Sequence, residues 1–447
     1  MCPCPQSISV CIQFAWIAAI LASYPSYLVD DRLQLNPDAR HYYALARNMV
    51  DEHVFSRSSS APFMLDPIRT PGYPAVIALF LIAGLNAVLS TIVLQVVLYV
   101  LATLILYYAV RSIFDEAIAL IAAILMTLDA TCHLLCYMLL TETIYMFALV
   151  LAFAACLYYL ARRTVPRAAL IGIVLSCAAY LRPSAVYLAI AVMPVFLFAS
   201  GRMSRKAITH AAATMVIVLV LCAPWVCRNA HLFGITKMSI IDDINAAYAT
   251  GASVYATRYG ISWEEAQDRI SREYSLPTYP EMMNFGVANA SYRDWAPKLR
   301  RAGFAIIAAH PWAFMASSVR SIVQSMISHS VNYLAYILGT TFSPLSASLA
   351  GNSFFVNALF CYEIFFNVTI FAMFAIGLPL SYIYYRTGLV RNREAFFLAL
   401  VFLAYLFAVT ATLGSVTYFR FRAPNMPFVY IFSALPLSWC VRRFMKR

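Results

Sequence analysis

The carboxylate of Asp38 is the first side chain that could do chemistry. Asp38 follows a proline, and Tyr42, Leu45 and Met49 recur after it at helical spacing, so a short helix that lies on a membrane is expected to begin here. The helix dipole favours an ionised carboxylate in the first turn. A plain helix cap is the simpler interpretation of this aspartate, and the other charged candidates of the sequence favour a functional one.

Glu142 is the second acidic candidate, in the otherwise apolar stretch Leu139-Leu-Thr-Glu-Thr-Ile-Tyr145. A carboxylate at such a place is costly and usually faces a cavity or a partner. It could instead reach the nearby lipid headgroups or pair with a neighbour on its own helix. Asp129 is a similar case with a weaker claim, because a turn at the end of an apolar segment explains it equally well.

Five arginines form the complementary set, each at the end of an apolar segment. They are Arg69, Arg182, Arg228, Arg420 and Arg422. A planar guanidinium binds phosphate through two parallel hydrogen bonds. Salt bridges to loop carboxylates or to lipid headgroups would explain any single one of these arginines, but they explain all five together less well. The set therefore favours an anionic ligand.

The elements that must position these residues are membrane helices. Of 447 residues, 62% are hydrophobic and 12% are charged, whereas soluble domains are about 45–50% apolar and about 25% charged. Segments in lipid must satisfy their own backbone hydrogen bonds. At roughly 20 residues per span, the sequence predicts an all-α integral membrane protein of about ten transmembrane helices, and up to twelve. The apolar runs are 8–28, 87–110, 117–136, 139–160, 168–181, 184–200, 207–227, 354–385, 394–413 and 424–441.

The first run, Ile8 to Leu28, lacks a convincing cleavage site and is expected to be an uncleaved helix. Basic connections recur after every second run, which predicts that they and both chain ends face the cytoplasm. The net charge of +12 is thus explained by topology and anionic lipid rather than by nucleic acid. The basic residues are Arg111; Arg162, Arg163 and Arg167; Arg202, Arg205 and Lys206; Arg386, Arg391 and Arg393; and Arg442, Arg443, Lys446 and Arg447.

The same parity divides the chain into three predicted parts. Residues 1–227 form an N-terminal transmembrane catalytic module with a first outer loop at 29–86, residues 228–353 form an extracytoplasmic loop region, and residues 354–447 form C-terminal transmembrane helices. The piece from Ala75 to Ala83 is too short to cross and is expected to lie on the surface. Gly303 to Ser328 is expected to be an interfacial amphipathic helix, or else part of two further crossings.

The order of short motifs resembles the GT-C membrane glycosyltransferases. Within them it is most similar to the dolichyl-phosphate-mannose protein mannosyltransferases (glycosyltransferase family 39) and their bacterial relatives, including the aminoarabinose transferase of lipid A. The stretch from about 240 to 350 matches no motif of that family. The motifs are Asp38-Ala-Arg-x-Tyr-Tyr-x-x-Ala, Arg69-x-Pro-Gly-Tyr-Pro, Thr141-Glu142, Leu181-Arg-Pro and Arg420-x-Arg-x-Pro-x-x-Pro427.

The resemblance implies a membrane glycosyltransferase that moves a hexosyl or pentosyl group from a polyprenyl-phosphate donor to a hydroxyl acceptor, with inversion, on the extracytoplasmic face of a bacterial inner membrane. The acceptor would be a lipid, a glycan or a protein. Asp38 would be the general base or would orient the acceptor, and Glu142 would be a second acidic residue of the catalytic centre. The expected substrate-binding residues are Arg69, Tyr42, Tyr43, Tyr73, Arg182, Arg420 and Arg422.

A sugar on a lipid phosphate already carries a good leaving group, so cationic side chains that neutralise the departing phosphate can replace a strong general acid. No cofactor is required, although a divalent metal shared by the two acidic residues stays open. The eleven cysteines show no metal-ligand spacing. The main rival function is a transporter or lipid flippase, but here the ionisable residues gather at helix ends. A non-catalytic assembly subunit is a third class.

Overall fold

The computed structural model describes residues 37–198, 204–283, 292–331, 354–413 and 419–445. Apart from an isolated bridge between Ser56 and Leu65, the regular structure of these residues is helical, which confirms the all-α fold class. One bundle is formed by α4 (Ala87–Ile113), α5 (Glu116–Leu128), α7 (Glu142–Ala161), α8 (Val165–Leu181), α9 (Ala185–Phe198), α10 (Arg205–Phe233), α18 (Phe354–Arg386), α19 (Arg393–Thr412) and α21 (Met426–Met445).

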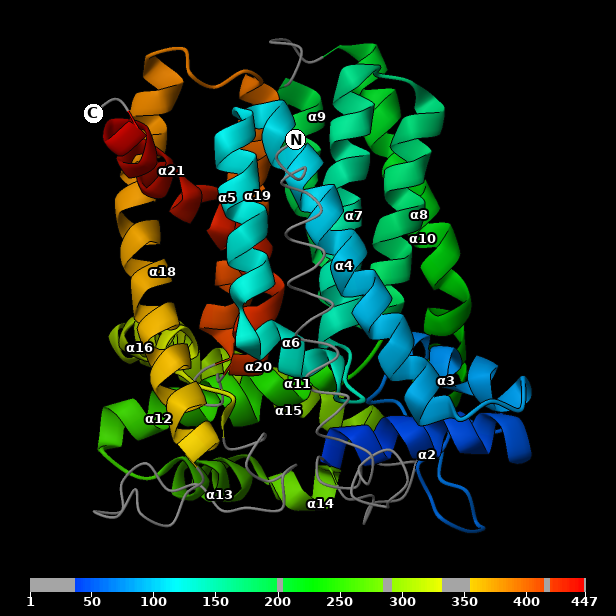
Figure 1. Cartoon of the computed structure of the whole chain (residues 1–447). Coiled ribbons are helices and arrows are strands. Elements are labelled where there is room, and N and C mark those ends of the chain that lie inside the picture. The colour runs from blue at the N-terminus through cyan, green and yellow to red at the C-terminus, as the bar shows by residue number, and fades with distance from the viewer. Residues whose placement is uncertain (1–36, 199–203, 284–291, 332–353, 414–418, 446–447) are drawn as a thin grey trace.

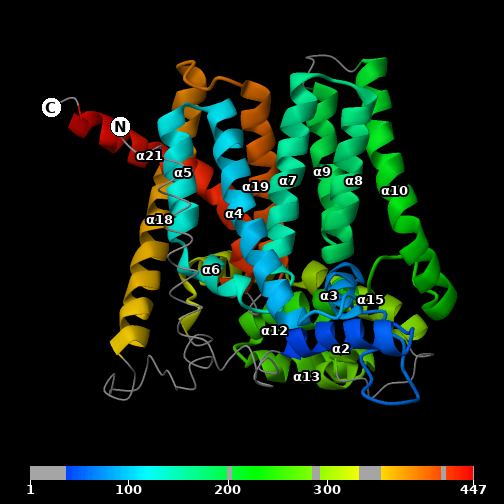
Figure 2. The same ribbon diagram turned by 45° about the vertical axis from the view of Figure 1, so that its right-hand side comes forward.

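The other helices, most of them shorter, gather at one end of this bundle, as both ribbon views show (Figures 1 and 2). This places the first loop and the region between α10 and α18 together, as the parity of the apolar runs predicts. These elements are α2 (Pro37–Asp51), α3 (Gly72–Ile82), α6 (Ala130–Cys136), α11 (Ile241–Ile244), the π-helix η2 (Asn245–Gly251), α12 (Ala252–Tyr259), α13 (Trp263–Tyr274), α14 (Tyr279–Met283), α15 (Tyr292–Ala309), α16 (Pro311–Ile327), α20 (Phe419–Arg422) and the 3-10 helix η6 (Ala423–Asn425).

Five of the described helices, α4, α7, α10, α18 and α19, are long and apolar enough to cross a membrane, and the count is seven if the bent pairs α5 with α6 and α15 with α16 each form one span. Helices α8 and α9 are apolar but shorter, with 17 and 14 residues. The run at 8–28 lies outside the described residues. The prediction of ten to twelve spans is therefore not confirmed, although the other nine apolar runs all coincide with helices.

The basic connections meet at the opposite end of the bundle from the shorter helices (Figure 1). Arg163 forms an ion pair with Glu394 at 2.5 Å, and Arg442 forms one with Asp115. The backbone N–H of Arg391 donates to the carbonyl oxygen of Ile113 at 2.8 Å. This segregation of basic residues is what the positive-inside rule predicts.

Two apolar cores hold these parts together. One lies among the long helices, and the second is built mainly from residues 233–306 with Ile68 of the first loop. The motif Arg69-x-Pro-Gly-Tyr-Pro lets α3 pack tightly against the end of α8, because a Cβ added to Gly72 would lie 2.5 Å from the carbonyl oxygen of Tyr180. This contact brings the chain near Arg69 next to the chain near Arg182.

Two predicted helices are broken in the structure. The run 117–136 contains two helices, α5 and α6, which meet at Asp129 with a bend of 59°. The break occurs here because the Asp129 side chain caps α6 by accepting from the N–H of Cys132 at 3.1 Å. The prediction of a single amphipathic helix at 303–328 is also wrong. Pro311 lacks an N–H and begins a new helix, so α15 and α16 meet at 102°.

Helix α16 has an inverted pattern of burial. Its exposed face carries apolar side chains, whereas its buried face carries serines that bond to the helix's own carbonyl groups. A helix in water would bury the apolar face instead, so the surroundings of α16 are expected to be lipid. The large apolar residues on the exposed face are Trp312, Met315, Val319, Val323 and Ile327, with Arg320 exposed among them, and the buried residues are Ser317, Ser321 and Ser325.

Candidate functional site

Asp38 lies in the first turn of α2, which begins at Pro37 as the sequence predicts. Its carboxylate forms ion pairs with two arginines from distant parts of the chain, Arg69 and Arg420, the latter at 3.0 Å. The Asp38 side chain is still 26% exposed. Burial alone would raise the pKa of Asp38, but Arg69 and Arg420 outweigh it and hold the pKa well below its ordinary value.

Arg69 is fixed by a turn that precedes α3. The carboxylate of Asp66 accepts from the N–H of Ile68 at 2.5 Å and from the N–H of Arg69 at 3.2 Å. The Arg69 guanidinium lies 5.1 Å from the ring centre of Tyr42 and donates to its hydroxyl at 3.4 Å. Tyr42 in turn packs edge-on against Tyr73 at 5.0 Å. The tyrosine rings therefore form one wall beside this guanidinium.

Glu142 is the first residue of α7, and its side chain is fully buried. One oxygen, Oε1, accepts from Nε of Arg420 at 2.8 Å and pairs with Nη2 of Arg182 at 2.7 Å. Arg182 also donates through Nε to the hydroxyl of Thr141 at 3.0 Å. Arg420 thus joins Glu142 to Asp38, although Asp38 and Arg420 lie far apart in the sequence.

The five residues form a row of alternating charge in the order Arg69, Asp38, Arg420, Glu142, Arg182. Three guanidinium groups against two carboxylates leave the row with a net charge of +1. Two buried atoms in it, Nε of Arg69 and Oε2 of Glu142, have no hydrogen-bond partner among the described residues. The row can therefore offer both a donor and an acceptor to a ligand as well as a positive charge.

Two other predicted substrate-binding residues, Tyr43 and Tyr73, are not members of the row. Tyr43 lies on the exposed side of α2. Tyr73 is buried and donates its hydroxyl to Oε1 of Gln95 at 3.0 Å. It therefore supports Tyr42 from behind.

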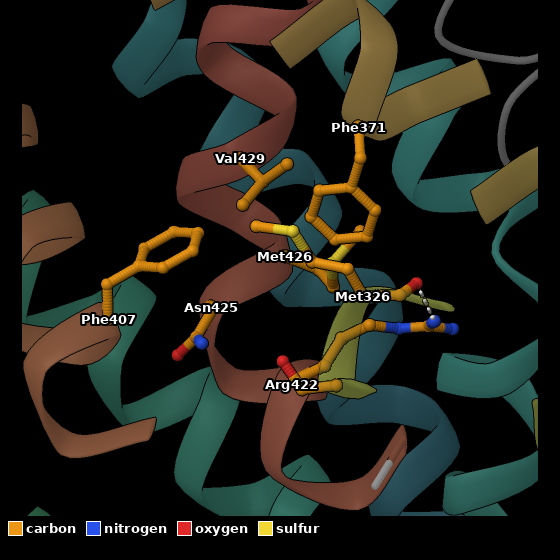
Figure 3. Close-up of a pocket in the computed structure, with 8 residues that line it drawn as sticks. Met326, Phe371, Phe407, Arg422, Asn425, Met426 and Val429 are labelled. Atoms are coloured by element: carbon orange, nitrogen blue, oxygen red, sulfur yellow. Dashed lines mark hydrogen bonds between the residues drawn. The ribbon is translucent and has the colours of Figure 1, made fainter. Parts of the chain in front are cut away.

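The structure does not bring Arg422 into the row. It donates to the carbonyl oxygens of Met326 and Ser328 at 3.1 and 3.0 Å and to the hydroxyl of Thr131 at 2.7 Å. Its side chain lines a separate narrow gap among α16, α18, α19 and α21, which has no room for a water molecule (Figure 3). Arg422 therefore ties the end of α16 to α6.

Arg228 and Asp129, the other two charged candidates, hold elements together. Arg228 donates to the carbonyl oxygen of Asp66 at 2.9 Å and lies 4.5 Å from the ring centre of Trp225. Asp129 caps α6 and accepts from the hydroxyl of Tyr430 at 2.5 Å. Each of these two charged side chains therefore has partners within the protein, and no ligand is needed to explain it.

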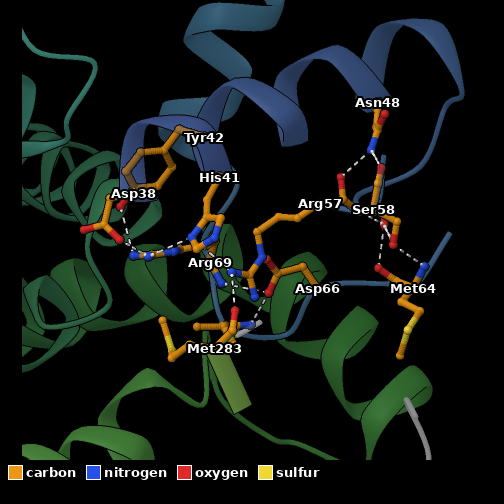
Figure 4. Close-up of polar contacts among 12 residues, drawn as sticks. Asp38, His41, Tyr42, Asn48, Arg57, Ser58, Met64, Asp66, Arg69 and Met283 are labelled. Carbon is orange, nitrogen blue, oxygen red and sulfur yellow. Dashed lines mark hydrogen bonds and ion pairs between the residues drawn. The ribbon is translucent and has the colours of Figure 1, made fainter. Parts of the chain in front are cut away.

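Three residues near the row were not predicted as site residues. His41 lies within hydrogen-bond distance of Arg57 and Arg69, and Arg57 pairs with Asp66 (Figure 4). The only sequence signal for His41 is its position three residues after Asp38, on the same side of a helix. Arg57 and Asp66 lie in a loop whose mixed charges gave no pattern.

A divalent metal shared by Asp38 and Glu142 does not fit this arrangement. The guanidinium of Arg420 bonds to both carboxylates and so takes the bridging place that such an ion would need. Within the described part of the chain, no group of three His, Cys, Asp or Glu side chains is arranged to hold a metal.

A model of a known protein family matches part of the sequence. Residues 68–227 match a family model described as dolichyl-phosphate-mannose-protein mannosyltransferase. The matched segment contains Arg69, Glu142 and Arg182. The resemblance to the GT-C glycosyltransferases is confirmed. No curated protein matches the sequence.

Two crystal structures of the oligosaccharyltransferase of Archaeoglobus fulgidus share the fold at 14% identity. The apo form has a TM-score of 0.53 over 99% of this chain and 52% of that one, and the form tethered with an acceptor peptide has 0.52 over 98% and 50%. The chain thus spans about half the length of these structures. ArnT from Cupriavidus metallidurans bound to undecaprenyl phosphate gives only 0.39 at 13% identity over 90% and 77%, which is too low to support an argument about fold.

Proposed function

We propose that this chain transfers a sugar from a polyprenyl-phosphate donor to a hydroxyl acceptor at the end of the bundle where the shorter helices gather. The observation that carries the proposal is the row of three arginines and two carboxylates, in which the Asp38 side chain is 26% exposed. Its net charge of +1 complements the single negative charge of a phosphodiester. The family model matched by residues 68–227 is named for such a donor.

Asp38 is the base of the proposed reaction. The acceptor hydroxyl attacks the anomeric carbon, its proton passes to Asp38, and the bond from that carbon to the phosphate oxygen breaks with the electron pair leaving on phosphate. Attack opposite to the leaving group inverts the anomeric centre. Departure turns a phosphodiester into a monoester and adds negative charge, which the nearby guanidinium groups stabilise.

Donor binding also prepares Asp38 for this role. In the unliganded structure the pKa of Asp38 is held low by Arg69 and Arg420 against the opposing effect of burial, so its carboxylate is a weak base. A phosphate bound to the same guanidinium groups would share their charge and bring the pKa of Asp38 back up. The base therefore becomes effective when the donor is in place.

The extracytoplasmic face is the proposed location of the site. The basic connections lie at the other end of the bundle, and such connections mark the cytoplasmic side. The apolar exposed face of α16 fits a helix that rests in the membrane at the level of the site. Placement in a bacterial inner membrane rests on the resemblance to bacterial relatives.

The test is transfer by the purified full chain in lipid nanodiscs supplied with a panel of polyprenyl-phosphate sugars and membrane-derived acceptors. We expect Asp38→Asn to lower the rate by roughly 10²-fold or more, as for loss of a positioned base. The matched control is Asp51→Asn, which changes an exposed aspartate of the same helix whose partner is Arg47 at 3.1 Å and should leave the rate unchanged.

Full activity of Asp38→Asn would remove Asp38 as the base. Movement of lipid-phosphate sugar across the bilayer, without transfer, would favour the flippase instead.

A further inference from the structure

His41 lies between two guanidinium groups at the edge of the row. Its Nδ1 is 3.1 Å from Nη1 of Arg57 and 3.4 Å from Nη2 of Arg69. Figure 4 shows the imidazole ring between these two side chains, one helical turn beyond Asp38.

The chemistry of the partners fixes the state of the ring. Guanidinium nitrogens only donate hydrogen bonds, so Nδ1 of His41 has to accept with its lone pair. The ring proton is then on Nε2, and the imidazole is neutral. In agreement with this geometry, burial, followed by Arg57 and Arg69, lowers the pKa of His41 to about 3 despite the opposing charges of Asp38 and Asp66.

Arg57, one of the two partners of Nδ1, is anchored in the protein interior. It pairs with Asp66 at 2.6 Å, and both side chains are almost completely buried. Arg57 also donates to the carbonyl oxygen of Met283 at the end of α14, at 3.2 Å. These buried contacts of Arg57 therefore help to set the position of Nδ1.

We propose that His41 is a positioning residue that holds the guanidinium of Arg69 against Asp38 and ready for the donor phosphate. This inference rests on the proposed function. The neutral imidazole separates two positive groups and gives each of them an acceptor. Without it, Arg57 and Arg69 would face each other with no acceptor between them, and the Arg69 side chain would turn away.

The state of the ring can be measured without any activity assay. We expect the ¹⁵N resonances of His41, assigned by their loss in His41→Asn, to report a neutral ring protonated at Nε2 and unchanged from about pH 5 to about pH 8. A ring that titrates near its ordinary pKa, or that carries its proton on Nδ1, would overturn the inference.

The positioning role is tested by binding of undecaprenyl phosphate to the full chain in nanodiscs. Asn places an oxygen near the position of Nδ1, whereas Leu has a similar size and no acceptor. We therefore expect His41→Leu to bind about 10-fold more weakly, as for loss of a hydrogen bond to a charged group, and His41→Asn to stay within about 3-fold of the wild type. His231→Leu and His231→Asn are controls at an exposed histidine.

The outcomes separate this inference from the proposed function. Equal weakening in both His41 variants would indicate a general structural role and overturn it, as would normal binding by His41→Leu. If the wild type binds no polyprenyl phosphate, the proposed function is wrong, and the ¹⁵N measurement alone decides whether the imidazole accepts from the two arginines.

Discussion

Arg420 is the residue on which the row of charges depends most, because its guanidinium forms ion pairs with both carboxylates. Replacing it with methionine keeps much of its volume and removes the charge. Asp38 would retain Arg69 and Glu142 would retain Arg182, so each carboxylate keeps one cation. The row would fall from a net charge of +1 to zero, and its two halves would no longer be joined.

The magnitude follows from the distances and the burial. Arg420 is 5% exposed, and it lies 2.8 Å from Glu142 and 3.0 Å from Asp38. At an effective dielectric constant of about 20, each contact has a gross attraction of roughly 5–6 kcal/mol, but desolvation reduces the measured loss on breaking a buried pair to about 3–5 kcal/mol. A loss of about 3 kcal/mol in donor binding or in the transition state is about 150-fold.

The assay is kcat/KM for transfer, together with the melting temperature in nanodiscs, for Arg420→Met, Glu142→Gln and the double variant. If Arg420 acts through Glu142, the double variant should lose less than the sum of the single losses, since either single change already breaks the ion pair between them. Arg420→Lys should lie between wild type and Arg420→Met, because an ammonium group cannot reproduce the fork of the guanidinium. Strict additivity, or normal activity of Arg420→Met, would refute the reasoning.

Two further predictions follow from the close contact at α3 and from the state of Asp38. Gly72→Ala should destabilise the fold by about 1–3 kcal/mol, since the added Cβ meets a backbone carbonyl and α3 has to move; an unchanged melting temperature would show that the contact between α3 and α8 is loose. Because the folded-state pKa of Asp38 is depressed, its stabilising effect is complete above the unfolded value of about 3.9 and fades as the pH falls below it. The difference in melting temperature between wild type and Asp38→Asn should therefore be constant from about pH 5 to about pH 8 and shrink below about pH 4; a difference that changes near neutral pH would mean another group is responsible.

Periodicity and charge in the sequence were enough to predict the helices and the end of the bundle where the shorter ones gather. A helix beginning next to Asp38 follows from local residue types, and the grouping of the two loop regions follows from the parity of apolar runs. The gathering of Asp38, Arg69, Glu142, Arg182 and Arg420 was expected from the family resemblance, and the structure brings these five together.

Directions of individual side chains could not be predicted in this way. Arg420 and Arg422 lie two residues apart in one helical turn, so they point to different sides, and only the packing of α16 decides which one meets Asp38. The breaks at Asp129 and Pro311 fall within apolar runs that look continuous. His41 gains its role from Arg57 and Asp66, which approach only when the loop folds back onto α2.

The row of charges also constrains how the chain matures. The carboxylates are contributed early in synthesis, at residues 38 and 142, whereas the cation that joins them comes near the end, at residue 420. Until that last part emerges and inserts, the two carboxylates lack the ion pairs that Arg420 makes with them, and each keeps its pair with an earlier arginine, Arg69 or Arg182. A chain that lacks the final helix would therefore hold the row in two separate halves.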